Sequence, residues 1–346
     1  MKYISYLSSC FNDNNCFKAN AVYNRDGCLT HLIELRESCK KLGFLINTND
    51  ITNPKDSDLV LIENVFGSNP YKRFSELKTL CKPMILICSE SPAVLKTNND
   101  IRILKLFDSV FSYNDELLSS SKLKNINKFN YTFEFPKKVP RENFLNKKLL
   151  CLISANKRSK HSSELYSKRV EIIRWYEKNS PRGFDLYGTG WENAKKAMAP
   201  WFRRKILQHG PWSNYFAPPF QSYKGIVDSK LQTLQNYKFS ICFENVKDIG
   251  GYITEKIFDS MFAGCVPIYL GADNIQDYIP RECFINFRRF SSILQMHEYL
   301  TTMESGKYEE YLDAIDRFTK SELSVPFKHE SFVDSMTKVI QKHLQI

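Results

Sequence analysis

Residues 237–280 read YKFSICFENVKDIGGYITEKIFDSMFAGCVPIYLGADNIQDYIP, and the order of patterns in this stretch decides the fold. The apolar run FSICF predicts a buried strand, and Glu244 and Asn245 follow at its carboxyl end. A glycine pair, an amphipathic segment ending near Gly264 and a second apolar run, VPIYLG, come next. This strand, helix, strand unit predicts an α/β domain, in which ligands bind at the carboxyl ends of parallel strands.

The helix of this unit has a polar face. A start near Tyr252 places four polar side chains on that face, those of Tyr252, Glu255, Lys256 and Asp259. Free amides at a helix N-terminus bind anions, so the first turn can hold a diphosphate, with Lys256 adding a charge. Gly250 and Gly251 predict a turn whose backbone approaches a ligand closely. An ordinary solvated helix surface is the alternative interpretation of such a face.

The same alternation of apolar runs and amphipathic stretches extends along the chain and predicts the α/β class throughout. We expect strands within residues 2–7, 43–47, 58–63, 83–90, 108–114, 149–157, 184–188, 237–245, 265–271 and 283–287. We expect helices within residues 29–41, 163–179, 230–236 and 253–264. Two such halves facing each other would leave a cleft between the carboxyl ends of their sheets.

Domain boundaries follow from composition. The segment FPKKVPRENFLNKK, residues 135–148, is rich in Pro, Lys and Asn and precedes a new apolar run, so we expect domains over residues 1–146 and 147–325. Residues 326–346 carry an apolar stripe with a four-residue spacing, made by Phe332, Met336, Ile340 and Leu344. The stripe predicts a C-terminal helix that packs on the body, with peripheral membrane contact as the alternative.

Composition limits the class of protein. The chain has 346 residues, of which 42% are hydrophobic, enough to bury a sizeable core. Its formal net charge of +11 suits anionic partners, but the lysines are scattered, and no nucleic-acid-binding motif is present. The ten cysteines form no CxxC pair and several lie in apolar runs, which predicts buried thiols in a reducing compartment. No window approaches the ~20 apolar residues of a membrane span. We therefore expect a cytoplasmic protein, at most peripheral at the inner membrane face.

The stretch FENVKDIGGYITEKIFDSMFAGCVPIYLGADN closely resembles the signature of family 10 glycosyltransferases, the α-1,3/4-fucosyltransferases. Because the sequence shows no membrane anchor or stem, it looks more like the bacterial or viral type of this family. The agreement falls at Phe243, Glu244, Asn245, Tyr252, Thr254, Glu255, Lys256, Gly264, Pro267 and Gly271. Weaker similarity covers nearly all of residues 147–290 and thins upstream to MILICSESP and LFDSVFSYNDEL. The resemblance implies a GT-B architecture of two Rossmann-like domains, the N-terminal one binding the acceptor and the C-terminal one binding GDP-fucose.

The resemblance also implies residue roles in an inverting transfer, which needs a base for the acceptor proton and cations for the departing diphosphate. Glu90, in SESP after the strand MILIC, matches the position of the family's proposed base. Arg169 and Lys256 match the cations, with Lys157 or Arg158 as substitutes. The other expected donor contacts are Asn156, Glu244, Asn245, Tyr252, Thr254 and Glu255. No Asp-x-Asp pair demands a metal, so we expect no required cofactor, with Mn²⁺ or Mg²⁺ left open as stimulants.

The acceptor expected from the resemblance is the O3 hydroxyl of a GlcNAc-containing glycan, as in Lewis-type structures, lipopolysaccharide or protein-linked glycans. A transferase that uses another nucleotide sugar and a catalytically silent glycan-binding relative are the alternatives. Residues 194–220 mix basic and aromatic side chains and predict a surface insert. A loop that touches acceptor or membrane through Trp201, Phe202 and Arg203 is the second interpretation of that segment.

Overall fold

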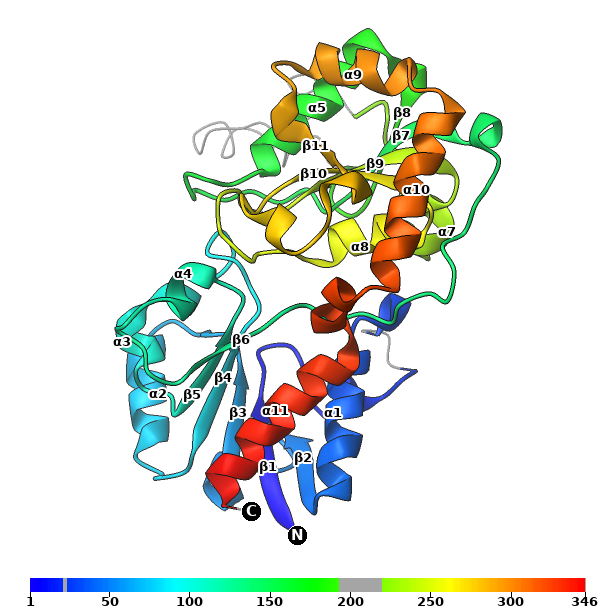
Figure 1. Cartoon of the computed structure of the whole chain (residues 1–346). Helices are drawn as coiled ribbons and strands as arrows, with labels where there is room; N and C mark the ends of the chain where they lie inside the picture. Colours follow the sequence, from blue (N-terminus) through cyan, green and yellow to red (C-terminus); the bar gives the residue numbers. More distant parts are fainter. Residues whose placement is uncertain (21–23, 193–219, 346) are drawn as a thin grey trace.

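The computed structural model describes residues 1–20, 24–192 and 220–345, which form two parallel β-sheets with helices on their faces (Figure 1). The sheet of the N-terminal half has the order β2-β1-β3-β4-β5-β6 and that of the C-terminal half the order β11-β10-β9-β7-β8. Every strand pair in both sheets is parallel. The predicted α/β class is therefore confirmed.

The strands of the N-terminal half are β1 (Lys2–Leu7), β2 (Phe44–Thr48), β3 (Leu59–Glu63), β4 (Met84–Cys88), β5 (Ser109–Ser112) and β6 (Ile126–Lys128). Those of the C-terminal half are β7 (Lys148–Ile153), β8 (Phe184–Tyr187), β9 (Tyr237–Phe243), β10 (Val266–Leu270) and β11 (Ile285–Asn286). The sequences MILIC of β4 and VPIYL of β10 are buried at every position, as expected where helices cover both faces of a parallel sheet. Each strand predicted from an apolar run is present, and β6 is an addition.

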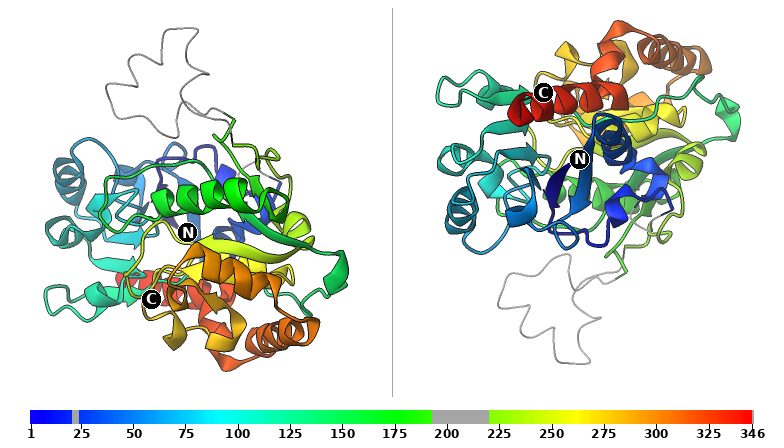
Figure 2. Two further views of the ribbon diagram at one scale, coloured as in Figure 1. Left: turned by 90° about the horizontal axis from the view of Figure 1, so that it is seen from above. Right: turned by 90° about the horizontal axis from the view of Figure 1, so that it is seen from below.

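The helices are α1 (Thr30–Lys41), α2 (Pro70–Lys78), α3 (Ile101–Leu104), α4 (Asp115–Leu118), α5 (Tyr166–Asn179), α7 (Lys230–Leu234), α8 (Glu255–Phe262), α9 (Ile293–Thr301), α10 (Ser305–Thr319) and α11 (His329–Leu344). Seen from above in Figure 2, α5 and the pair α9 and α10 lie on opposite sides of the second sheet. Helices α2, α3, α4, α9 and α10 are additions to the elements expected from the sequence.

Helix α11 returns to the N-terminal half and packs against α1 (Figures 1 and 2). The residues of the expected apolar stripe, Phe332, Met336, Ile340 and Leu344, are all buried in the core around β1 and α1. The chain therefore crosses between the halves twice, once after β6 and once before α11. The domain limits expected at residues 146 and 325 stay predictions.

In the three described ranges, none of the helices combines the length and the apolar character that a membrane crossing requires. Residues 194–219 of the expected surface insert, including Trp201, Phe202 and Arg203, lie outside the described residues.

Candidate active site

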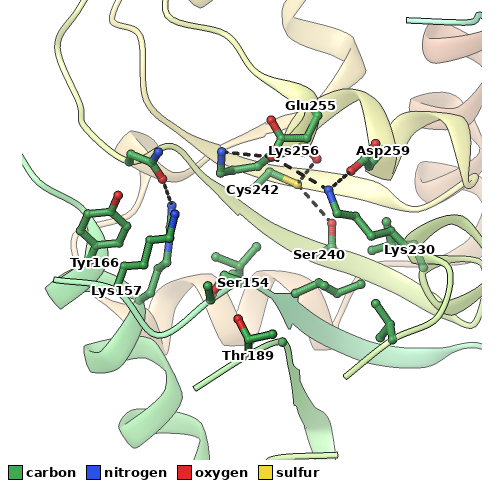
Figure 3. Close-up of a pocket in the computed structure, with 18 of the residues that line it drawn as sticks. Ser154, Lys157, Tyr166, Thr189, Lys230, Ser240, Cys242, Glu255, Lys256 and Asp259 are labelled. Carbon is green, nitrogen blue, oxygen red and sulfur yellow. Dashed lines mark hydrogen bonds and ion pairs between the residues drawn. The ribbon is translucent and has the colours of Figure 1, made fainter. Parts of the chain in front are cut away.

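A cavity of about 350 Å³ opens at the carboxyl end of the second sheet (Figure 3). Residues from both halves of the chain line it. We call it the first cavity. Its principal polar lining residues are Glu90, Tyr131, Ser154, Lys157, Tyr166, Arg169, Thr189, Lys230, Asn245, Glu255, Lys256 and Asp259. This is the place where ligands of parallel α/β sheets bind, because loops after several strands converge there.

Helix α8 begins at Glu255, so the predicted start near Tyr252 is wrong. Glu244, at the end of β9, accepts hydrogen bonds from the backbone nitrogen of Thr254 at 2.8 Å and from the Thr254 hydroxyl at 2.7 Å. These bonds hold Thr254 in an extended conformation, with φ −114° and ψ −174°, as the residue that precedes the helix. The helix therefore cannot extend back to Tyr252.

Tyr252 instead joins the two halves of the chain. Its side chain is buried, and its ring centroid lies 4.7 Å from that of Tyr113 and 6.5 Å from that of Tyr131. In the adjacent glycine turn, the carbonyl oxygen of Gly250 accepts a hydrogen bond of 3.2 Å from the backbone nitrogen of Asp115. The glycine turn was expected to approach a ligand, but its close neighbours include Asp115 of the N-terminal half and Asn274.

Charged side chains alternate in sign along the first cavity. The Nζ atom of Lys256 lies 3.2 Å from Glu244 Oε2 and 3.5 Å from Glu255 Oε1. Lys230 Nζ lies 2.7 Å from Asp259 Oδ2 and 3.9 Å from Glu255 Oε1 (Figure 3). Burial opposes ionisation of Glu255, but Lys256 and Lys230 outweigh it and lower the pKa of its carboxyl to about 2. Glu255 is therefore an anion at neutral pH, held between two cations.

Arg169 lines the same cavity from α5 and is itself buried. Its Nη2 atom donates to the carbonyl oxygens of Phe243 at 2.6 Å and Glu244 at 2.8 Å, and to Asn245 Oδ1 at 3.3 Å. These bonds fix the carboxyl end of β9. The Nε atom of Arg169 is buried and has no hydrogen-bond partner within the described residues.

Glu90 follows β4 and lines the cavity from the N-terminal half. Its position is fixed by its backbone, because its nitrogen donates to Asn64 Oδ1 at 2.9 Å and its carbonyl oxygen accepts from Asn98 Nδ2 at 2.9 Å. Burial raises the pKa of the Glu90 carboxyl, although the charges of Lys157 and Lys256 oppose the rise. A carboxylate with a raised pKa is a stronger base than an ordinary glutamate.

A second cavity of about 640 Å³ lies on the side of the N-terminal half. It shares Glu90, Tyr131, Lys230, Glu255 and Asp259 with the first cavity. The remaining polar lining includes Asp26, His31, Glu63, Ser89, Thr132 and Glu134, and the apolar lining includes Phe129, Phe133, Phe262 and Phe332. Glu90 therefore stands where two spaces of ligand size adjoin.

The sequence-predicted site residues fall into two groups. Those that line the first cavity are Glu90, Lys157, Arg169, Asn245, Glu255 and Lys256. Those that are not among its lining residues are Asn156, Glu244, Tyr252 and Thr254. Asn156 donates to the carbonyl oxygen of Gly190 at 2.9 Å, and Glu244 is fully buried beneath Thr254 and Lys256. This second group supports the cavity wall.

Sequence reasoning missed Lys230, which lines both cavities. The sequence did contain a signal for it: Asp259 lies one helical turn after Glu255, and two neighbouring carboxylates on one helix face indicate a cation nearby. Among the described residues, no group of three His, Cys, Asp or Glu side chains is placed to hold a metal ion. The expectation that catalysis requires no metal stays a prediction.

Comparison with known proteins supports the sequence resemblance. Residues 214–343 match the family model described as glycosyltransferase family 10 (fucosyltransferase), C-terminal part. The chain is 36% identical over 90 residues to the alpha-(1,3)-fucosyltransferase FucT of Helicobacter pylori, covering 26% of this chain and 18% of that protein. It is 35% identical over 80 residues to an alpha-(1,4)-fucosyltransferase of Arabidopsis thaliana, covering 22% of this chain and 20% of that protein. The matched part thus spans about a fifth of these relatives.

Solved structures resemble the whole chain. A crystal structure of an alpha1,3-fucosyltransferase superposes with a TM-score of 0.58 at 16% identity, covering 99% of this chain and 90% of that one. The Anabaena protein Alr3699/HepE, solved in complex with UDP and glucose, superposes with a TM-score of 0.58 at 11% identity, covering 99% and 100%. At these identities the similarity shows the fold, and it confirms the predicted GT-B architecture. In its matched region, residues 214–343, this chain resembles glycosyltransferase family 10, the fucosyltransferases.

Proposed function

We propose that this protein transfers L-fucose from GDP-fucose to a hydroxyl of a glycan, with inversion at the anomeric carbon. One observation carries the proposal: a carboxylate with a raised pKa, Glu90, lies between two adjoining cavities, one of which is lined by cations. The match of residues 214–343 to the fucosyltransferase family model supports fucose as the transferred sugar.

The first cavity is the proposed donor site. Lys157 lines it from the loop after β7, Arg169 from α5 and Lys256 from α8, so these cations can surround a diphosphate. Positioned cations stabilise the negative charge that develops on a departing diphosphate, and they do so more strongly in a partly buried site than in water. Lys256 is preorganised for this role, because its ammonium group donates hydrogen bonds to Glu244 and Thr254.

The proposed reaction is a single in-line displacement. An acceptor hydroxyl in the second cavity attacks the anomeric carbon of fucose and gives its proton to the carboxylate of Glu90. The bond between that carbon and the diphosphate oxygen breaks, and its electron pair leaves with GDP. Glu255, which stays ionised because its pKa is about 2, can balance the positive charge that develops on the sugar ring.

The finer assignments follow the family resemblance. We propose the O3 hydroxyl of a GlcNAc-containing glycan as acceptor, and the cations Lys157, Arg169 and Lys256 in place of a required metal. We also propose a cytoplasmic location. The free thiols of Cys16, Cys39, Cys88, Cys151, Cys242, Cys265 and Cys283, all buried, support a reducing compartment.

Incubation of the purified chain with GDP-fucose on a glycan array, followed by mass spectrometry of the products, tests the proposal. We expect a glycan to gain one fucose and the Glu90→Gln variant to lose this activity. GDP-mannose and UDP-glucose serve as control donors. Turnover of either control donor in place of GDP-fucose would identify a transferase with another donor, and tight binding of GDP-fucose without any product would identify a silent relative.

A further inference from the structure

Several acidic side chains line the second cavity. Its carboxylates are those of Asp26, Glu63, Glu90, Glu134, Glu255 and Asp259. They come from both halves of the chain and surround the space in which the proposed function places the acceptor. Charged groups on several sides of one cavity act together on any ion that enters it.

Within the described residues, cations balance only part of this charge. Lys230 pairs with Asp259 at 2.7 Å, Lys256 lies 3.5 Å from Glu255, and the charges of Lys157 and Lys256 act on Glu90. His31 also lines the cavity, but burial and the neighbouring His329 lower its pKa to about 3, so it is neutral. Glu63 and Glu134 therefore leave an excess of negative charge in the described part of the lining.

Glu63 lies close enough to Glu90 for the two carboxylates to repel each other. Its carboxylate accepts hydrogen bonds from the Tyr6 hydroxyl at 2.5 Å and from the Ser89 hydroxyl at 3.4 Å. Burial raises its pKa, and the charge of Glu90 adds to the rise despite these two donors. The charge of Glu90 thus disfavours a second negative charge beside it, and a foreign anion in the same space would meet the same repulsion.

The rest of the lining suits an uncharged sugar. Phe129, Tyr131, Phe133 and Phe332 present aromatic surface, which packs against the apolar face of a pyranose ring. The carboxylates and the Thr132 hydroxyl present acceptors for sugar hydroxyl groups. Apolar walls with a few polar groups are typical of small-molecule sites.

We infer, on the basis of the proposed transfer, that the sugar entering the second cavity carries no acidic group, and that a sulfate or carboxylate on that sugar blocks its use. The excess of carboxylates repels an acidic sugar. Specificity then comes from weaker binding of the acidic sugar and not from extra contacts to the neutral one. Glu134, at the exposed edge of the cavity, and Glu63, at its buried side, are the specificity-determining residues that lie outside the proposed chemistry.

The test uses an array that presents each glycan in a neutral, a sulfated and a uronic-acid form. Two signals are read: binding of glycans by the chain loaded with GDP, and transfer from GDP-fucose. We expect the neutral form to be favoured by on the order of tenfold to a hundredfold in both signals. The preference should shrink as ionic strength increases, because salt screens charge repulsion.

Variants locate the effect. Glu134→Gln and Glu63→Gln each remove one negative charge with little change of shape and should raise relative use of the anionic forms severalfold. The control Glu298→Gln removes the same charge from the exposed surface of α9 and should leave the ratio unchanged. Circular dichroism of each variant confirms that it folds.

Equal binding and transfer of neutral and anionic forms by the parent chain would overturn the inference, as would a failure to bind any neutral glycan. An unchanged ratio in both cavity variants would also overturn it. The proposed function fails separately, when titration calorimetry detects no binding of GDP-fucose. Binding of neutral glycans without transfer would contradict the proposed catalysis and leave the charge selection supported.

Discussion

Gly251 lies directly against the backbone of Tyr113: a Cβ atom on Gly251 would stand 2.3 Å from the Tyr113 carbonyl oxygen and 2.4 Å from Lys128 Nζ. Lys128 in turn donates to the Tyr113 carbonyl at 2.9 Å and pairs with Asp115 at 2.6 Å. The residue that precedes Tyr252 and the site helix α8 is thus fitted to the N-terminal half. Only glycine can occupy this place, because its φ is +76° and no side chain fits.

Gly251→Ala should therefore loosen the contact between the halves. We expect the free energy of unfolding to fall by about 1–3 kcal/mol, from backbone strain and displacement of Lys128. Gly250→Ala is the matched control, because its added Cβ would meet only the ends of the Asn274 and Asp115 side chains, at 3.3 Å, and its φ is not positive. Chemical denaturation measures both. Equal stability of the two variants would show that the Gly251 contact is not tight in solution.

Glu90→Gln should remove the proposed base. We expect kcat for fucosyl transfer to fall by roughly 10²–10⁴-fold while calorimetry shows unchanged GDP-fucose affinity, since the loss of a general base affects chemistry more than donor binding. Glu116→Gln, on the exposed surface of α4, is the control and should transfer at the parent rate. Parent-level transfer by Glu90→Gln would exclude Glu90 as the base.

The pH dependence of transfer follows from the raised pKa of Glu90. A base must be deprotonated to act, so kcat/KM should fall as the pH drops through the pKa of Glu90, at a higher pH than for an ordinary glutamate. Lys157 lowers this pKa, so Lys157→Ala should move the acid limb to higher pH. A pH profile of both proteins checks the sign. A shift of the limb to lower pH in Lys157→Ala would contradict the arrangement.

Lys256→Ala should affect both turnover and stability. We expect turnover to fall by about 10²–10³-fold, the usual cost of one preorganised electrostatic group. The free energy of unfolding should fall by about 1–3 kcal/mol, because the buried carboxylate of Glu244 would keep only the two donors of Thr254.

The control for Lys256 is Lys320→Ala, which breaks an exposed pair with Asp316 and should change neither quantity measurably. Fucosyl transfer assays and thermal denaturation separate the two effects. Full turnover by a folded Lys256→Ala variant would remove Lys256 from the leaving-group site.

Local patterns predicted much of this structure. Apolar runs such as MILIC and FSICF located strands because buried parallel strands are continuously apolar, and a glycine correctly marked the end of α8 near Gly264. The start of α8 was misplaced because helical spacing alone cannot show that Glu244, ten positions earlier, fixes Thr254 in an extended conformation. Glu244 comes from the end of β9, so this contact depends on the tertiary structure and not on the local sequence of the helix.

Contacts between the halves could not be predicted from spacing. Gly250 and Gly251 fit a ligand-binding turn as well as a turn fitted to another part of the chain, and only the fold places Tyr113 beside them. The apolar stripe of α11 predicted a buried face but gave no sign that its partner is α1, some three hundred positions away in the chain. Lys230 was missed for the same reason, because its partners Glu255 and Asp259 lie on a different helix.

A crystal structure of the chain with GDP tests the central claim most directly, because every proposed role depends on where the diphosphate binds. The account predicts diphosphate oxygens within hydrogen-bond distance of Lys256 Nζ, in the first cavity and facing Glu90 across the sugar position. A diphosphate bound elsewhere, with Lys256 and Arg169 out of contact, would contradict it.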